Sequence, residues 1–152
     1  MENSNKKKQF MGLRIYTGGT FDLFHIGHLN LLKRCSQIAG TDGQVIVALN
    51  TDEFIEKYKG KKPIIVYEDR KSILEACRYV DCVMENYGGA DSKESILLAQ
   101  LIDVIAIGSD WATKDYYKQM NFTQDWLDEQ GISLIYIPYT KKISSTKIKN
   151  LL

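Results

Sequence analysis

The sequence predicts a single α/β domain built on about five parallel strands. Short apolar segments rich in β-branched residues alternate with segments of helical periodicity along the chain. The apolar segments mostly lack polar alternation, which is typical of strands that helices cover on both faces. Alternating strands and helices indicate a parallel sheet with right-handed crossovers. No repeat or linker divides the chain, so we expect one domain at 13–152 behind a flexible polar tail at 1–12.

The elements follow from the hydrophobic pattern. Strands are predicted at Leu13–Thr17, Val45–Leu49, Cys82–Met84, Val104–Ile107 and Leu134–Ile137. Helices are predicted at about Gly27–Ala39, Thr51–Tyr58, Tyr67–Val80, Ser92–Leu101 and Thr123–Gln130. In the first helix, Leu31, Cys35 and Ile38 recur at i, i+4 and i+7, which predicts one buried stripe. A last helix is expected to start near Ser144 or Ser145.

Composition and charge argue against several classes of protein. The chain has 20 Lys and Arg against 19 Asp and Glu, so its net charge of +1 favours neither nucleic acid nor an anionic membrane as a partner. No segment approaches the ~18 apolar residues of a membrane span, and the polar start lacks the apolar core of a secretory signal. Cys35, Cys77 and Cys82 form no CxxC pair, which predicts small buried thiols in a reducing compartment. We therefore expect a cytoplasmic enzyme.

The turn after the first predicted strand carries the strongest chemical signal. In open α/β sheets, ligands bind beyond the carboxyl ends of the strands, often against helix N-termini. Gly18 and Gly19 in this turn let backbone N–H groups approach a phosphate closely. The helix predicted to start near Gly27 adds the positive end of its dipole. The turn is therefore a candidate phosphate site.

Both histidines of the chain, His25 and His28, lie three residues apart in this same turn. There they would bring two hydrogen-bond donors to one spot, and Gly27 between them leaves room for a bulky ligand. Metal binding is the rival interpretation, but the segment supplies no third convergent ligand beyond Asp22. Neither a Walker lysine nor GxGxxG spacing is present, which argues against a P-loop or dinucleotide site.

Gly19-Thr20-Phe21-Asp22 followed by His25-Ile26-Gly27-His28 resembles the signature of the HxGH nucleotidyltransferases. The resemblance implies a Rossmann-like, doubly wound fold. It also implies that His25 and His28 contact triphosphate oxygens and stabilise charge while the α-phosphorus is attacked. The other residues that it assigns to nucleotide binding in this turn are Gly18, Gly19, Thr20, Phe21, Asp22 and Gly27.

The segment ISSTKIK, residues 143–149, resembles the second signature of this family, R-T-x-G-I-S-T-T, in its cytidylyltransferase branch. Capping of a helix start is by itself a sufficient reason for Ser144 and Ser145. The resemblance implies contacts with the β- and γ-phosphates, made by Thr140, Ser144, Ser145 and Thr146. The family arginine is Tyr139 here and the glycine is Lys142. Lys141 or Lys142 could restore the positive charge, although a lysine lacks the forked geometry of a guanidinium.

Two basic features lie in the middle of the chain. A lysine cluster precedes Pro63 and comprises Lys57, Lys59, Lys61 and Lys62. It is either a solvated loop or, as the resemblance implies, a cationic arm for the acceptor phosphate and the triphosphate, with Lys59 and Lys61 as the main candidates. Arg70 is a candidate ligand of the acceptor phosphate, and an ion pair with Glu68 or Asp81 is the alternative.

Ile107-Gly108-Ser109-Asp110-Trp111 resembles the G-x-D-W segment of the family. The resemblance implies that Asp110 bonds the ribose or the base amine and that Trp111 packs over the nucleotide, although a buried tryptophan is more often core. The motifs occur in family order from about residue 13 to 149. The glycerol-3-phosphate cytidylyltransferases are the most similar group, through TDEF, RYVD, GSDW and STKIK.

The resemblance therefore predicts transfer of CMP from CTP to a small phosphorylated alcohol, for which glycerol 3-phosphate is the best candidate, with release of pyrophosphate. Mg²⁺ is expected to travel with the triphosphate, the protein is expected to hold no metal site of its own, and a homodimer is implied. One alternative is an adenylyltransferase acting on a sugar phosphate or another phosphorylated metabolite, which KGKKP at 59–63 supports. Another is a nucleotide-binding regulatory protein without catalysis.

Overall fold

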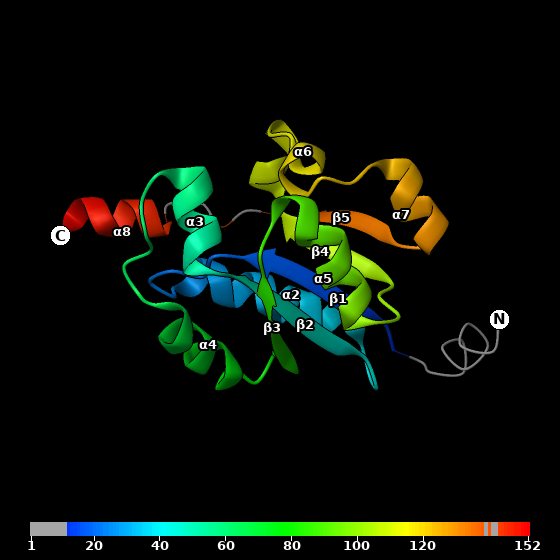
Figure 1. Cartoon of the computed structure of the whole chain (residues 1–152). Coiled ribbons are helices and arrows are strands. Elements are labelled where there is room, and N and C mark those ends of the chain that lie inside the picture. Colours follow the sequence, from blue (N-terminus) through cyan, green and yellow to red (C-terminus); the bar gives the residue numbers. More distant parts are fainter. Residues whose placement is uncertain (1–11, 139, 141–142) are drawn as a thin grey trace.

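The computed structural model describes residues 12–138, 140 and 143–152, which form one parallel sheet with helices on both faces (Figure 1). The strands are β1 (Arg14–Gly19), β2 (Gln44–Asn50), β3 (Cys82–Asn86), β4 (Val104–Gly108) and β5 (Ser133–Ile137). Their order in the sheet is β3-β2-β1-β4-β5. The predicted five-stranded α/β fold is confirmed. Of the tail predicted at 1–12, only Gly12 is among the described residues.

Helices cover the two faces of the sheet in separate groups. They are α2 (Ile26–Ala39), α3 (Asp52–Lys59), α4 (Tyr67–Glu75), α5 (Ser92–Ala99), α6 (Tyr116–Met120), α7 (Gln124–Gln130) and α8 (Ser145–Leu151), with 3-10 turns η1 (Gly89–Asp91) and η2 (Ser109–Thr113). Leu32 of α2 and Leu74 of α4 pack on one face, and Ile96 of α5 and Leu127 of α7 pack on the other. This is the doubly wound arrangement. Among the described residues, no helix combines the length and the apolarity needed to cross a membrane.

The central strands are buried on both sides. In β2, Val45 and Val47 belong to the core on one face, while Ile46 and Ala48 belong to the core on the other. This explains the continuous apolar runs in the sequence. The edge strand β3 is less covered, so Cys82 is exposed, and the prediction that all three thiols are buried holds fully only for Cys35.

The strands β1 and β4 separate toward their carboxyl ends. β1 pairs with β2 over its whole length, from Arg14 to Gly19, but it pairs with β4 only at Ile15 and Tyr16. Strand order also reverses here, because β2 and β3 extend the sheet on one side of β1 while β4 and β5 extend it on the other. A crevice at this switch point is the expected ligand site of an open α/β sheet.

Two helices differ from the prediction. The helix predicted at Tyr67–Val80 ends at Glu75. Asp81 donates its N–H to the carbonyl of Val45 at 2.9 Å, and its carboxylate accepts the N–H of Val45 at 2.7 Å. Asp81 is thereby fixed beside β2, and the residues before it must form a turn rather than another helical turn. The short α6 was not predicted, because five residues carry too little periodicity.

The buried stripe of α2 is shifted by one position. Its fully buried residues are Leu32, Cys35 and Ala39, whereas the predicted Leu31 and Ile38 flank the core and are partly exposed. A helix repeats every 3.6 residues, so several neighbouring stripes fit the same apolar pattern. Packing against the sheet decides among them.

Replacement of Leu127 by alanine tests the second core. The Leu127 side chain is 0 % exposed, so Leu127→Ala should lower the free energy of unfolding by about 2–5 kcal/mol, measured by urea denaturation. Leu98→Ala is the matched control, since Leu98 also lies on a helix but is 68 % exposed. It should shift stability by no more than about 0.5 kcal/mol. Equal losses in the two variants would contradict the assignment of Leu127 to the core.

Candidate active site

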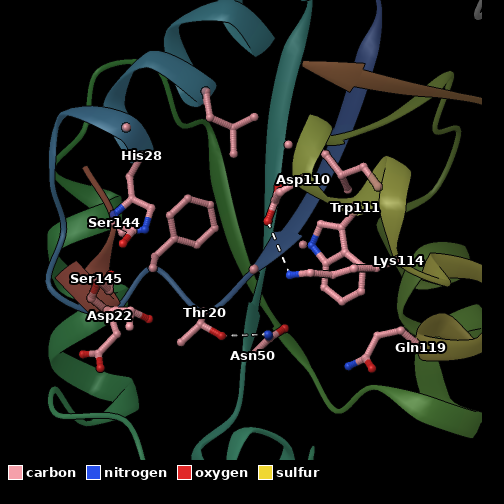
Figure 2. Close-up of a pocket in the computed structure, with 18 of the residues that line it drawn as sticks. Thr20, Asp22, His28, Asn50, Asp110, Trp111, Lys114, Gln119, Ser144 and Ser145 are labelled. Carbon is pink, nitrogen blue, oxygen red and sulfur yellow. Dashed lines mark hydrogen bonds and ion pairs between the residues drawn. The ribbon is translucent and has the colours of Figure 1, made fainter. Parts of the chain in front are cut away.

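A cleft of about 650 Å³ opens where β1 and β4 separate. In Figure 2, His28 and Ser144 lie on one side of this cleft, and Asp110 and Trp111 lie on the other. Of the described residues that the sequence assigned to the site, Arg70 and Lys61 do not line the cleft. The others do, and they are His25, His28, Lys59, Gly18, Gly19, Thr20, Phe21, Asp22, Gly27, Asp110, Trp111, Thr140, Ser144, Ser145 and Thr146. The fold thus brings together motifs that lie more than a hundred residues apart in the sequence.

The two histidines cap the N-terminus of α2. His25 is the N-cap residue, and its Nδ1 accepts the N–H of Gly27 at 3.0 Å. His28 is the third helical residue, and its Nδ1 accepts the N–H of His25 at 3.1 Å. These bonds form a reciprocal capping box, which satisfies N–H groups that a helix start leaves without partners. The spacing of three residues between the histidines is therefore the spacing that a helix N-terminus requires.

Capping also fixes the protonation of the two rings. Because Nδ1 of each ring accepts a backbone N–H, the proton of the neutral imidazole is assigned to Nε2, which is a donor. Burial lowers the pKa of His25, and burial together with the neighbouring His25 lowers the pKa of His28 to about 3. Both side chains are thus neutral donors near pH 7.

Glycine at position 27 allows the rings to stack. The ring centroids of His25 and His28 are 3.8 Å apart. A Cβ atom at Gly27 would lie 2.8 Å from Cε1 of His25, which is too close for the ring to keep its place. The rings of Phe21 and Phe24 also pack near His28, with centroids 5.2 and 5.4 Å away, and contribute to the burial that lowers its pKa.

Asp22 joins three segments around the cleft. Its carboxylate accepts the N–H groups of Ile64 and Ile65 at 2.8 and 2.9 Å, and it forms an ion pair with Lys149 of α8 at 3.1 Å. Burial alone would raise the pKa of Asp22, but these donors outweigh it and lower the pKa. The carbonyl of Asp22 also accepts the hydroxyl of Ser145. Asp22 was predicted to bind nucleotide. In the structure, both of its carboxylate oxygens accept hydrogen bonds from protein groups, so Asp22 connects the segments that form the walls of the cleft.

The start of α8 forms the wall next to the histidines. Ser144 is the N-cap and accepts the N–H of Lys147 at 3.0 Å, which confirms the predicted helix start. The hydroxyl of Thr140 accepts a hydrogen bond from Asn30 of α2 at 3.2 Å, and this bond ties the segment to the same helix as His28. Tyr139, Lys141 and Lys142, where the sequence departs from the family signature, lie outside the described residues.

The opposite wall is built by η2. Asp110 forms an ion pair with Lys114 at 3.7 Å, and the Lys114 ammonium lies 5.1 Å from the centre of the Trp111 ring (Figure 2). Trp111 is half-buried and packs edge-on against Tyr116, so it is neither fully core nor freely exposed. Oδ1 of Asp110 lies 2.7 Å from the place where Gly108 would carry a Cβ atom. Glycine before this carboxylate is therefore needed for its position.

Of the predicted lysine cluster, Lys59 alone lines the cleft among the described residues. It is the last residue of α3, which ends at Gly60 in the left-handed conformation (φ 76°). Lys57, Lys61 and Lys62 are exposed and are not among the residues that line the cleft. The cluster therefore contributes one cation to the site. Lys57 is an exposed residue of α3, and Lys61 and Lys62 lie in the loop that follows it.

Comparison with known proteins decides the family. The cytidylyltransferase-like family matches residues 16–151. The chain belongs to the cytidylyltransferase-like family. The glycerol-3-phosphate cytidylyltransferase of Bacillus subtilis is 40% identical over 136 residues, which cover 90% of this chain and 94% of that protein. An FAD synthase of Korarchaeum cryptofilum is 37% identical over 110 residues, 72% of this chain and 73% of that protein.

Solved structures support the fold. The lipopolysaccharide core biosynthesis protein of Thermoplasma volcanium superposes with a TM-score of 0.66 at 21% identity, over 87% of this chain and 99% of that chain. With its family shown, this chain is a nucleotidyltransferase with cytidylyltransferase-type activity, and its partners are a nucleotide and a small phosphorylated substrate. Membership of this family supports an enzyme and argues against the alternative of a nucleotide-binding regulatory protein without catalysis.

Arg70 requires a correction within this cytidylyltransferase-like site. It was predicted to bind the acceptor phosphate, but its side chain is 0 % exposed and does not line the cleft. Its guanidinium donates to the carbonyls of Ile65, Thr20 and Asn50 at 2.8–2.9 Å, and it pairs with Asp52 at 2.5 Å. The alternative partners Glu68 and Asp81 are also wrong. Arg70 supports the cleft indirectly, because it fixes the backbone carbonyls of Thr20 and Asn50, two residues that line the cleft.

Several residues of the cleft were missed by sequence reasoning. They are Asn50, Asn86, Phe54, Tyr58, Lys114, Gln119 and Lys149. Asn50 and Asn86 end β2 and β3, so the rule that ligands bind at carboxyl ends of strands would have found them. Gln119 had no such signal, because α6 itself was not predicted.

The cleft offers Mg²⁺ no cage of protein carboxylates. Its carboxylates are Asp22 and Asp110, and each already has a lysine partner, Lys149 and Lys114. Within the described ranges, no group of three or more His, Cys, Asp or Glu side chains gathers. Mg²⁺ commonly binds through substrate phosphates with few protein ligands. These residues thus fit an ion that arrives with the triphosphate, which remains a prediction.

The supporting role of Arg70 can be tested without substrate. Arg70→Lys removes the fork that reaches four acceptors and should lower the free energy of unfolding by about 3–5 kcal/mol, as for other broken buried pairs. Arg78→Lys is the matched control, because Arg78 is exposed and, within the described part of the chain, its side chain donates a hydrogen bond only to Tyr79. Urea denaturation of the free protein gives both values. Unchanged stability of Arg70→Lys with a raised KM for the acceptor would return Arg70 to the role of a ligand.

The depressed histidine pKa values predict a pH dependence. In the unfolded chain, His28 is protonated below its ordinary pKa of 6.5. In the folded protein, His28 stays neutral down to about pH 3. The free energy of unfolding should therefore fall as pH drops from about 6.5 toward 3, and this contribution should be complete above 6.5. Nitrogen-15 NMR should show His28 neutral and protonated at Nε2 at pH 5. A His28 titration near 6.5 would contradict the burial of its ring.

Proposed function

We propose that this enzyme transfers CMP from CTP to the phosphate of a small phosphorylated alcohol, glycerol 3-phosphate, forming CDP-glycerol and pyrophosphate. The observation that carries the proposal is the pair of neutral imidazoles, His25 and His28, whose Nε2–H donors are fixed by the capping of α2. Relatives from Bacillus subtilis and Staphylococcus aureus, 40% and 38% identical, bear the name glycerol-3-phosphate cytidylyltransferase and support the choice of substrates.

The reaction needs no nucleophilic side chain. An oxygen of the acceptor phosphate forms the new bond to the α-phosphorus of CTP, and the bond from this phosphorus to the bridging oxygen of pyrophosphate breaks in line with it. Catalysis is then positioning and charge neutralisation. His25 and His28 donate to the oxygens that gain charge, while Ser144, Ser145 and Thr146 meet the phosphates that leave.

The remaining ligands complete the proposal. Asp110 and Trp111 bind the nucleoside, and Lys59 meets the acceptor phosphate. Mg²⁺ bound to the triphosphate supplies further positive charge. The protein acts as a homodimer in the cytoplasm, in line with the resemblance of its sequence to the family.

An adenylyltransferase is the second candidate. Several archaeal relatives bear the name FAD synthase, and one from Thermococcus kodakarensis is 32% identical over 100% of this chain. FAD contains an adenylyl group, so the same cleft would take ATP and a different phosphorylated acceptor. The geometry of the histidines serves both reactions equally.

Pyrophosphate release by the purified chain distinguishes these functions. CTP and ATP are each combined with glycerol 3-phosphate, phosphocholine, phosphoethanolamine, sugar phosphates and FMN. We expect release with CTP and glycerol 3-phosphate. Release only with ATP would assign the enzyme to adenylyl transfer, and His28→Ala serves as the control, since loss of one such donor should lower kcat about 100- to 1,000-fold. Activity of His28→Ala within a few-fold of the wild type would refute the role of the histidines.

A further inference from the structure

The side of the cleft formed by β2 and β3 contains polar groups that the proposed reaction does not use. Asn50 and Asn86 end these strands, are 7 % and 2 % exposed, and both line the cleft. Oδ1 of Asn50 accepts a hydrogen bond from Nδ2 of Asn86 at 2.8 Å, and Nδ2 of Asn50 donates to the Thr20 hydroxyl at 3.1 Å (Figure 2). Oδ1 of Asn86 accepts the N–H of Gly88 at 3.1 Å. The two amides therefore form one fixed unit.

This amide pair has hydrogen-bonding capacity to spare. A side-chain amide carries two N–H donors, and each of these asparagines uses only one toward the described residues. Buried polar groups in folded proteins usually have partners, so two spare donors in a cleft indicate a ligand oxygen. Gln119 of α6 adds a third amide, which points into the cleft and makes no hydrogen bond to a described residue (Figure 2).

The chemistry of these groups suits hydroxyl oxygens. Amides are neutral and offer both donors and an acceptor, as a hydroxyl group does. Beside them, the hydroxyls of Thr20 and Tyr58 lie 3.1 Å apart and extend the polar surface. Asn50 and Asn86 lie across β1 from β4, whose end leads into η2, where the proposed function binds the nucleoside at Asp110. Gln119 extends into the cleft from the opposite side, on α6 beside Trp111 (Figure 2). The acceptor is the ligand left to occupy this polar surface.

The same cleft is poorly suited to a cationic acceptor. A bound ammonium group needs a free carboxylate or an open aromatic face. The more exposed Tyr58 and Trp111 rings already have the ammonium groups of Lys59 and Lys114 at 5.6 and 5.1 Å from their centres. The other aromatic side chains that line the cleft, Phe21, Phe54 and Tyr116, are buried. The carboxylates of the cleft, Asp22 and Asp110, are paired with lysines as described above.

We propose that Asn50, Asn86 and Gln119 bind the hydroxyl groups of the acceptor, so that the enzyme selects a phosphorylated polyol over a phosphorylated amino alcohol or a phosphate ester without hydroxyls. The proposal rests on the proposed function for the placement of the nucleotide. It goes further by assigning the selection among acceptors to particular side chains.

Calorimetric titration tests this selection without relying on catalysis. Glycerol 3-phosphate, propyl phosphate and phosphocholine are titrated into the full chain, with and without CMP. Propyl phosphate has the same carbon chain without the free hydroxyls. We expect the wild type to bind glycerol 3-phosphate at least about tenfold more tightly than either of the others, since tenfold corresponds to roughly one hydrogen bond.

Variants assign the preference to residues. Gln119→Met removes an amide that has no bond to a described residue, so the fold should persist. Asn50→Ser removes both donors of the Asn50 amide without adding a charge. Both should lower the affinity for glycerol 3-phosphate several-fold and leave propyl phosphate unchanged. Gln130→Met is the matched control, on the exposed end of α7, and should change neither.

The outcomes separate this inference from the proposed function. Equal affinity of the wild type for the three phosphates, or no binding of any, would overturn the inference. Equal loss of affinity for glycerol 3-phosphate and propyl phosphate in the variants would also overturn it, because the amides would then not act on hydroxyls. Pyrophosphate release with CTP, measured separately, tests the proposed function whatever the titration shows.

Discussion

The early end of the pairing between β1 and β4 is the constraint on which the site depends. β1 pairs with β4 only up to Tyr16, so the two strands are separated at their carboxyl ends. The turn after β1 lies at this separation and places the N-terminus of α2 there. If β1 and β4 had remained paired to their carboxyl ends, their backbone would occupy the space of the cleft. The two halves of the sheet then supply the two walls, with Asn50 and Asn86 on one side and Asp110 on the other.

Backbone in such a crevice has no neighbouring strand to satisfy it, so buried charged side chains take that role. Asp22 accepts the N–H groups of Ile64 and Ile65, and Arg70 donates to three carbonyls from separate segments. Each ion is compensated by a partner of opposite charge, Lys149 or Asp52. These side chains fix the loops that carry the reactive groups, which explains why two charged residues near the chemistry are engaged with protein atoms.

The histidines show how structural and chemical demands coincide. A helix start needs acceptors for its first N–H groups, and the Nδ1 atoms provide them. The same bonds leave Nε2–H as the outward donor, and the phenylalanines beside His28 keep it neutral. Donors already oriented before substrate binds need no reorganisation during the reaction, which is the condition for strong electrostatic stabilisation. The lysines of the cleft then carry its positive charge.

The sequence by itself determined the class of fold, the position of every strand and the motifs of the site, because hydrophobic periodicity and glycine-rich turns are local properties of a chain. The tertiary structure decided what each polar side chain contacts. Nothing local distinguishes Arg70, whose guanidinium is buried among three carbonyls, from Arg78, which is exposed. Nothing local distinguishes Lys59, at the cleft, from Lys61, outside it. Burial and partners depend on segments that are distant in sequence, and only the packed sheet and its crevice bring those segments together.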